Sequence, residues 1–89
     1  MVKIKASKDI SKIVKGDIVK VDGKPYEVDA VEVLIDHGKN KEMAIEVFDK
    51  KTDKDYQLRF FDDNVEGTME FYELKEIVYD RVNLEKVEW

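Results

Sequence analysis

The sequence predicts an all-β fold, a small barrel with a C-terminal β extension. Three features support this prediction: short runs alternate apolar and polar residues, polar turn signals separate the runs, and the C-terminal part favours extended chain by composition. The chain has 89 residues, of which 43% are apolar and 42% charged, which is enough for one domain with its own core. We therefore expect a single domain over residues 1–89, with a barrel core over 1–66 and an extended segment over 67–89 that packs on the core or extends it.

The first hairpin is predicted from "KGDIVKVDGKPYEV". Val19 and Val21 alternate with charged neighbours, and the alternation resumes at Tyr26 and Val28. Asp22-Gly23 between them is a strong signal for a tight hairpin turn. We therefore expect two antiparallel strands joined at this dipeptide.

The returning strand changes the phase of its alternation. One parity holds Tyr26, Val28 and Ala30, and the other holds Val31, Val33 and Ile35. Because side chains alternate between the two faces of a strand, this change predicts a bulge or a sharp bend. A small barrel requires such bends, since one strand then contributes to both packed faces.

Two further strands are predicted after the polar loop at 36–42. The first carries Met43, Ile45 and Val47, and the second, after the turn "DKKTDKD", carries Tyr56, Leu58 and Phe60. In the second run Gln57 and Arg59 point to the opposite face. Residues 17–61 are therefore expected to form a four-stranded antiparallel meander.

The C-terminal stretch "GTMEFYELKEIVYDRVNLEKVEW" has two interpretations. Phe71, Leu74 and Val78 have the spacing of a helical stripe, so a helix over 68–80 is one alternative. The abundance of aromatic and β-branched residues favours extended chain instead. We predict strands here.

The charge distribution excludes a globally basic polyanion binder. The net charge is −5, and residues 62–89 carry nine acidic residues against three basic ones. The first 24 residues carry seven Lys and three Asp, so a local basic face is a candidate. Its members would be Lys12, Lys15, Lys20 and Lys24. The alternative is a lysine-rich surface that is merely solvated.

The cellular compartment is expected to be the cytoplasm. The chain has no Cys, so neither a disulfide framework nor a thiolate metal site is available. The N-terminus "MVKIKASKDI" is interrupted by lysines, and no uncharged stretch approaches the roughly 20 residues of a membrane helix. We expect no membrane association.

The residues do not predict an enzyme. Ser7 and Ser11 lie in a lysine-rich segment, and His37 is the only imidazole available to activate a nucleophile. Asp36 and His37 alone are a weak metal signal, and "DHGKNKE" lacks the first glycine and the hydroxyl of a phosphate-binding loop. The paired carboxylates at 62–63 are better explained as surface solvation than as acid–base groups. We expect no catalytic residue, no metal and no cofactor.

The loop in "LIDHGKNKEMA" is the best candidate for a functional element. Its polar residues are His37, Gly38, Lys39, Asn40 and Lys41. Gly38 has access to a positive φ, and Asn40 is the next best residue for that conformation. A lysine at the apex of a hairpin projects one cation on a flexible stem away from an acidic body. The alternative is an ordinary polar hairpin turn.

The chain resembles the N-terminal, KOW-like domain of bacterial elongation factor P and its archaeal and eukaryotic relative, initiation factor five-A. The resemblance rests on "KGDIVKVDGKPYEVDAVE", "HGKNKE", "TDKDYQLRF" and "DDNVEG", in the family's order. It implies a translation-type SH3-like barrel that here stands alone, without the family's later domains. It also implies that Lys39, after Gly38 in the loop between the third and fourth strands, corresponds to the family's enzymatically lengthened lysine. His37 and Asn40 stand where the family usually has Pro and Gly.

Two functions are expected from these features. The first is a non-enzymatic, translation-factor-like domain that binds the ribosome, ribosomal RNA or tRNA through the Lys39 loop, supported by His37, Gly38, Asn40 and Lys41. The alternative is a protein-interaction module on the same fold, with Tyr72, Tyr79 or Trp89 in a contact patch. Self-association through an unpaired C-terminal strand is a further option.

Overall fold

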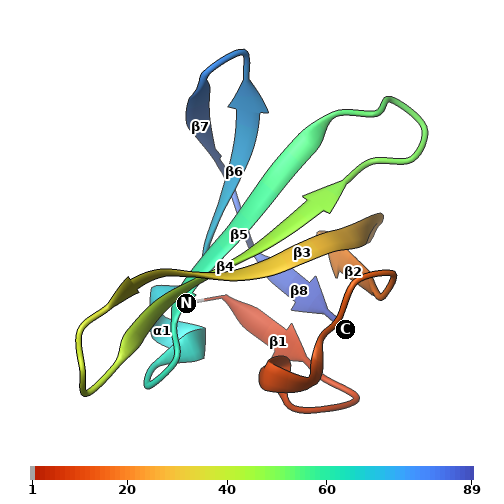
Figure 1. Cartoon of the computed structure of the whole chain (residues 1–89). Helices are drawn as coiled ribbons and strands as arrows, with labels where there is room; N and C mark the ends of the chain where they lie inside the picture. The colour runs from red at the N-terminus through yellow and green to blue at the C-terminus, as the bar shows by residue number, and fades with distance from the viewer. Residues whose placement is uncertain (1) are drawn as a thin grey trace.

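The computed structural model describes residues 2–89, which form one coiled eight-stranded sheet (Figure 1). The strands are β1 (Lys3–Lys5), β2 (Ile18–Val21), β3 (Lys24–Asp36), β4 (Lys41–Phe48), β5 (Asp55–Phe61), β6 (Glu70–Lys75), β7 (Val78–Val82) and β8 (Lys86–Glu88). Two short turns of helix, η1 (Ile10–Lys12) and α1 (Val65–Thr68), lie between strands. The order in the sheet is β1-β8-β2-β3-β4-β5-β6-β7, and the sheet is not closed. The prediction of an all-β fold is confirmed.

The predicted meander over 17–61 is confirmed by β2 to β5. Each strand in this series pairs antiparallel with the next. Asp22 and Gly23 both have positive φ, 50° and 83°, which is the pattern of the tight turn whose twist matches a β-hairpin. The local turn signal therefore sets the register of the first hairpin, with Val19 opposite Tyr26.

The C-terminal part forms strands, as predicted, in place of the alternative helix over 68–80. β6 pairs with β5, and β7 returns along β6. A single helical turn precedes them, with the Asn64 side chain accepting a hydrogen bond from the Gly67 N–H. β8 then lies between β1 and β2, parallel to β1 and antiparallel to β2. The segment over 67–89 therefore supplies both one edge of the sheet and a strand inside it.

The core lies on the concave side of the coiled sheet. Ile45, Leu58 and Phe71 stand opposite one another on β4, β5 and β6, and all three are buried. Tyr26 and Tyr56 pack on Phe71, with ring centroids 5.4 and 5.2 Å away. The other buried apolar residues are Ile13, Val19, Val21, Val28, Ala44, Val47, Phe60, Met69 and Val87.

The outer half of β3 differs from the prediction. A register shift between Val28 and Ala30 confirms the predicted bulge. Val31, Val33 and Ile35 are nevertheless exposed, so the prediction that this strand contributes to a second packed face is wrong. The reason is that β2 is short: its ladder with β3 ends at Glu27, and no strand in residues 2–89 covers that side of β3 further along.

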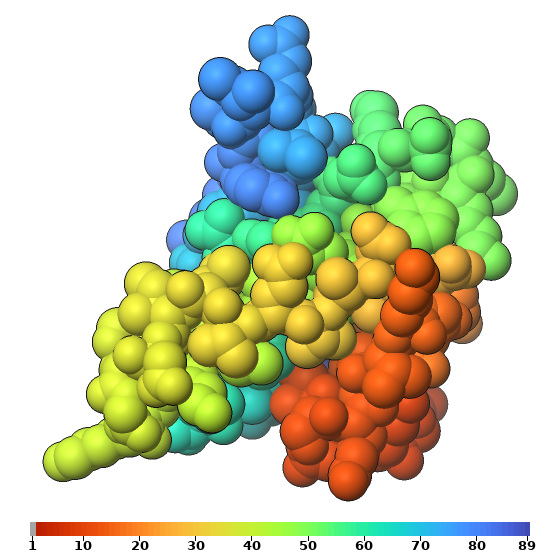
Figure 2. Space-filling model, viewed as in Figure 1, coloured from red at the N-terminus to blue at the C-terminus, as the bar shows by residue number. Residues whose placement is uncertain are grey.

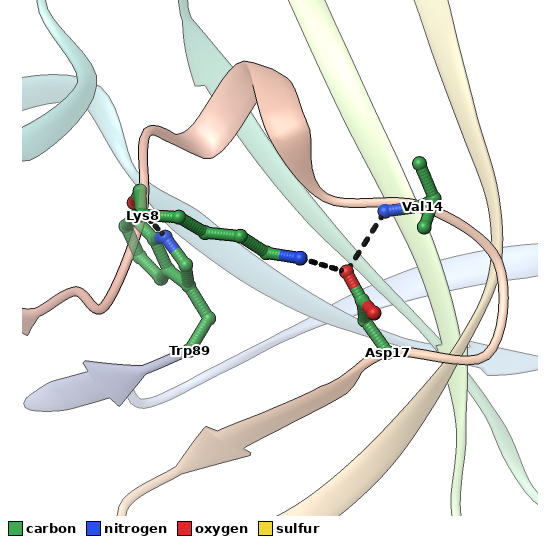
Figure 3. Close-up of polar contacts among 4 residues, drawn as sticks. All are labelled: Lys8, Val14, Asp17 and Trp89. Atoms are coloured by element: carbon green, nitrogen blue, oxygen red, sulfur yellow. Dashed lines mark hydrogen bonds and ion pairs between the residues drawn. The ribbon is translucent and has the colours of Figure 1, made fainter.

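The lysine-rich N-terminal segment is held against the C-terminal end of the chain (Figure 3). The Trp89 indole Nε1 donates a hydrogen bond of 2.8 Å to the Lys8 carbonyl oxygen. The Lys8 ammonium pairs with the Asp17 carboxylate at 2.6 Å, and the Val14 N–H donates to the same oxygen at 3.0 Å. These contacts, Lys8 first, lower the pKa of Asp17. The segment therefore closes one end of the core.

One ion pair predicts the acid sensitivity of the fold. Asp49 is 3% exposed, and the Lys24 ammonium lies 2.8 Å from its Oδ2. Lys24, followed by the Lys51 N–H, lowers the Asp49 pKa from 3.8 to about 2. Because the folded pKa lies below the unfolded one, the stabilisation is complete above about pH 4 and is lost as the pH falls through 2.

Lys24→Met is expected to lower the thermal midpoint at pH 6, because it leaves a buried carboxylate without its cation. The difference in thermal midpoint between variant and wild type should shrink as the pH falls towards 2, because a protonated Asp49 carries no charge to neutralise. Thermal unfolding between pH 2 and 6 measures this. Lys39→Met is the control, since Lys39 is exposed and its profile should match wild type. A difference between Lys24→Met and wild type that stays constant over this range would contradict the assignment.

Candidate functional site

The β3–β4 hairpin projects from the sheet at the lower left of Figures 1 and 2. Its tip is a tight turn with Gly38 and Lys39 at the centre, closed by a 2.9 Å hydrogen bond from the His37 N–H to the Asn40 oxygen. Gly38 has a φ of 84°, as predicted, and its N–H donates to the Asp36 side chain at 2.8 Å. Asn40 does not have a positive φ. A tight hairpin turn with positive φ at its first central residue favours glycine there. Gly38 is that residue, and Lys39 is the second central residue.

Hydrogen bonds connect the base of the hairpin tip to the turn after β5. The Lys41 N–H donates to the Asp62 side chain at 2.8 Å, and the Asp62 N–H donates to the Lys41 oxygen at 3.0 Å. The Asn40 amide donates to the Asp63 side chain at 3.2 Å. These bonds connect residues more than 20 positions apart. The tip is therefore held in a defined direction by the body of the protein.

Lys39 has no ion-pair partner within 4.0 Å among residues 2–89 and is exposed. The nearby carboxylates of Asp36, Asp62 and Asp63 are each engaged in a hydrogen bond within the loop region. Lys41 is likewise exposed and without an ion-pair partner among residues 2–89, so the loop leaves two cations free to contact an external anion, with Lys39 at the apex.

His37 is positioned by packing. Its ring lies 5.9 Å from the ring of Phe61, centroid to centroid. Over residues 2–89, no three His, Asp or Glu side chains gather in a way that could hold a metal ion. The main chain of His37 closes the turn through its N–H, and its ring lies near Phe61.

The four lysines of the candidate basic face lie in different parts of the structure. Lys24 pairs with Asp49, Lys12 lies in η1, and Lys15 lies in the turn before β2. Lys20 instead joins a different group on the outward face of β1, β8 and β2, which consists of Lys3, Lys5, Lys20 and Lys86 around Glu88. The Lys86 hydrogen bond, followed by the charges of Lys86, Lys5 and Lys20, lowers the pKa of Glu88.

This second group, here called the β1–β8–β2 lysine face, could not be found from the order of charges along the chain. Lys3 and Lys86 become neighbours only because β1 pairs parallel with β8. The only part of this face that the local sequence indicates is the pair Lys3 and Lys5, because their alternation with Ile4 predicts that both lysines lie on the same side of a strand.

The aromatic residues proposed as a contact patch are engaged within the protein. Tyr72 and Tyr79 flank the Arg59 guanidinium, with ring centroids 4.1 and 5.2 Å from its central carbon. Burial is the main factor that raises the pKa of both phenols. Trp89 is fixed by its bond to Lys8. These side chains therefore contribute to the stability of the fold through contacts within the protein.

A cleft of about 1170 Å³ lies between α1 and the connection from β7 to β8. Its lining mixes charges of both signs, and Arg81, one of its cations, already pairs with Glu70 at 3.0 Å. The hairpin tip remains the better candidate.

Comparison of the chain with protein-family models, curated proteins and solved structures finds no match. No helix in residues 2–89 has the length and apolar character needed to cross a membrane.

Proposed function

We propose that the protein is a non-enzymatic, translation-factor-like domain of the SH3-like barrel type, which binds ribosomal RNA or tRNA through the tip of the β3–β4 hairpin. The observation that carries this proposal is the exposed Lys39 ammonium, which has no ion-pair partner in the described part of the chain, at the apex of a projecting hairpin. The coiled antiparallel meander and the position of the loop between β3 and β4 agree with what the family resemblance implies.

The electrostatics favour contact through the tip over contact through the acidic surface. The protein has a net charge of −5, so RNA phosphates are repelled by most of its surface. A lysine on a flexible stem can reach a phosphate while the acidic body stays at a distance. The Asp62 and Asp63 bonds hold the turn before binding, which reduces the conformational entropy lost when RNA is bound.

A second contact is available on the β1–β8–β2 lysine face. Its four lysines surround one carboxylate, that of Glu88, in an otherwise acidic molecule. The alternative function, a protein-interaction module using Tyr72, Tyr79 or Trp89, has less support because those side chains already hold Arg59 and Lys8.

The proposal predicts association with ribosomes that weakens as salt is added. If Lys39 and Lys41 each neutralise one phosphate, log K should fall with log salt with a slope of about −1.4 to −1.8. Lys39→Gln should reduce the magnitude of the slope by about 0.7–0.9 and weaken co-sedimentation at low salt. Lys51→Gln is the matched control, since Lys51 is an exposed lysine in the turn after β4. The absence of co-sedimentation at low salt, or equal effects of the two variants, would reject the proposal.

A further inference from the structure

β3 has a free backbone edge over 29–36. At Val28 the edge is still occupied, because Val28 N–H donates to the Asp17 oxygen and Gly16 N–H donates to the Val28 oxygen, both at 2.8 Å. Beyond Val28, β4 pairs along one side, and none of the described residues supplies a strand on the other. In Figure 1 this part of β3 runs outward to the hairpin tip with no neighbour on its outer side.

The free edge concentrates exposed apolar side chains. Of the eight large apolar residues that are exposed within 2–89, four lie here: Val31, Val33, Leu34 and Ile35. Val31 stands opposite the buried Ile45, and Val33, which is 51% exposed, stands opposite Met43. The apolar face of the sheet therefore continues to this edge and is left uncovered there.

The edge carries charged residues and two register shifts, which limit strand addition, but it lacks the two residue types that block an edge most often. Residues 29–36 contain neither Lys nor Pro, the residues that most often block an edge. Two register shifts, at Val28/Ala30 and Val33/Ile35, leave Ala30–Val33 as the regular stretch between them. This length matches a short added strand.

The charges at the edge decide the kind of partner. Asp29, Glu32 and Asp36 are its only charged residues, and none of them has an ion-pair partner among residues 2–89. A second copy added antiparallel would bring two acidic edges together, which is unfavourable. A basic strand would instead be attracted.

We propose that Ala30–Val33 accepts a short extended segment of a partner protein in which apolar residues alternate with Lys or Arg. The main-chain groups of the segment extend the sheet beside β3. Its apolar side chains cover Val31 and Val33 on the core-facing side. Because Glu32 points to the opposite face, the basic side chains lie next to its carboxylate.

The test uses a fluorescein-labelled peptide, acetyl-Lys-Val-Lys-Val-Lys-Val-amide, added to the folded protein. Anisotropy measures affinity, and amide hydrogen exchange locates the contact. Protection is expected to rise within 29–36. A peptide of the same sequence with an N-methyl group on every residue has the same charge but donates no main-chain hydrogen bond from either edge, so it should bind about tenfold or more weakly. A Glu-Val peptide should bind more weakly still.

Two protein variants separate edge pairing from general attraction to an acidic surface. Val33→Lys places a cation within the accepting stretch, at its last residue, and is expected to weaken binding about tenfold. Ile77→Lys makes the same change of charge at a residue that is 93% exposed in the β6–β7 turn, and should bind within about twofold of wild type. Lys39→Gln should bind as wild type does, so this surface is tested independently of the RNA proposal.

Three results would overturn the proposal. The first is equal binding of the N-methylated peptide, and the second is protection confined to residues outside 29–36. The third is a wild-type dimer in light scattering that Val33→Lys dissociates, because the occupant would then be a second copy of this chain.

Discussion

Phe71→Ala is expected to lower the free energy of unfolding by about 3–5 kcal/mol, because it removes a large buried ring and leaves a cavity. Phe71 is 1% exposed. Its ring stacks on Tyr56 at 5.2 Å with an interplanar angle of 4°, and meets Tyr26 edge-on at 5.4 Å. The total stability of a domain of this size is about 5–13 kcal/mol, so the loss is a large part of it.

Urea unfolding measures this loss. With a denaturant slope of about 1–3 kcal/mol/M, the midpoint should fall by at least about 1 M. Ile77→Ala is the control, because Ile77 is exposed and its truncation should change stability by less than about 0.5 kcal/mol. If the midpoint of Phe71→Ala were indistinguishable from that of Ile77→Ala, the ring cluster would not be the centre of the core.

The strands that the sequence predicts are those whose signals are local. The Asp22-Gly23 turn fixes its own backbone conformation, so the alternation on either side of it identifies the two strands correctly. Val33 shows the limit of this reasoning. Its alternation is that of a core strand, but whether an apolar residue is covered depends on the length of the neighbouring strand, and β2 begins only at Ile18, opposite Glu27. Such a non-local property cannot be inferred from the alternation of β3.

In the candidate site, too, the local feature can be predicted from the sequence and the long-range contacts cannot. The turn at Gly38 and Lys39 is predictable because glycine marks a positive φ. Its attachment to Asp62 and Asp63 is not, because those residues approach the tip only when β5 pairs with β4. In the linear sequence they are simply two more carboxylates in an acidic stretch.

The position of β8 explains why the charge clusters of the sequence and of the surface differ. β8, from the C-terminal part of the chain, lies between β1 and β2, from its N-terminal part. Lys86 is therefore a neighbour of Lys3 and Lys5 on the surface, although acidic residues precede it in the sequence. The basic N-terminal third and the acidic C-terminal third are therefore interleaved in the sheet. The β1–β8–β2 lysine face results from this arrangement.

The outer face of β5 carries a network that joins the β6–β7 hairpin to the rest of the sheet. The Arg59 guanidinium lies between the rings of Tyr72 and Tyr79, and its Nε donates to the Gln57 side-chain oxygen. The Gln57 amide in turn donates to Glu46 at 3.0 Å. Gln57 is only 3% exposed, so its oxygen has little access to water if the arginine is removed.

Arg59→Ala is therefore expected to destabilise the protein by about 2–3 kcal/mol, combining an unsatisfied buried oxygen with the loss of the cation–π contacts. Arg81→Ala is the matched control, since Arg81 is an arginine on the same face whose exposed ion pair with Glu70 should be worth about 0–1 kcal/mol. Hydrogen exchange adds a local measurement. Removal of Arg59 should speed exchange in β6 and β7 before β2 and β8, because the network holds the hairpin and not the opposite end of the sheet. Uniform acceleration across all strands would mean that Arg59 supports the whole fold and not this hairpin.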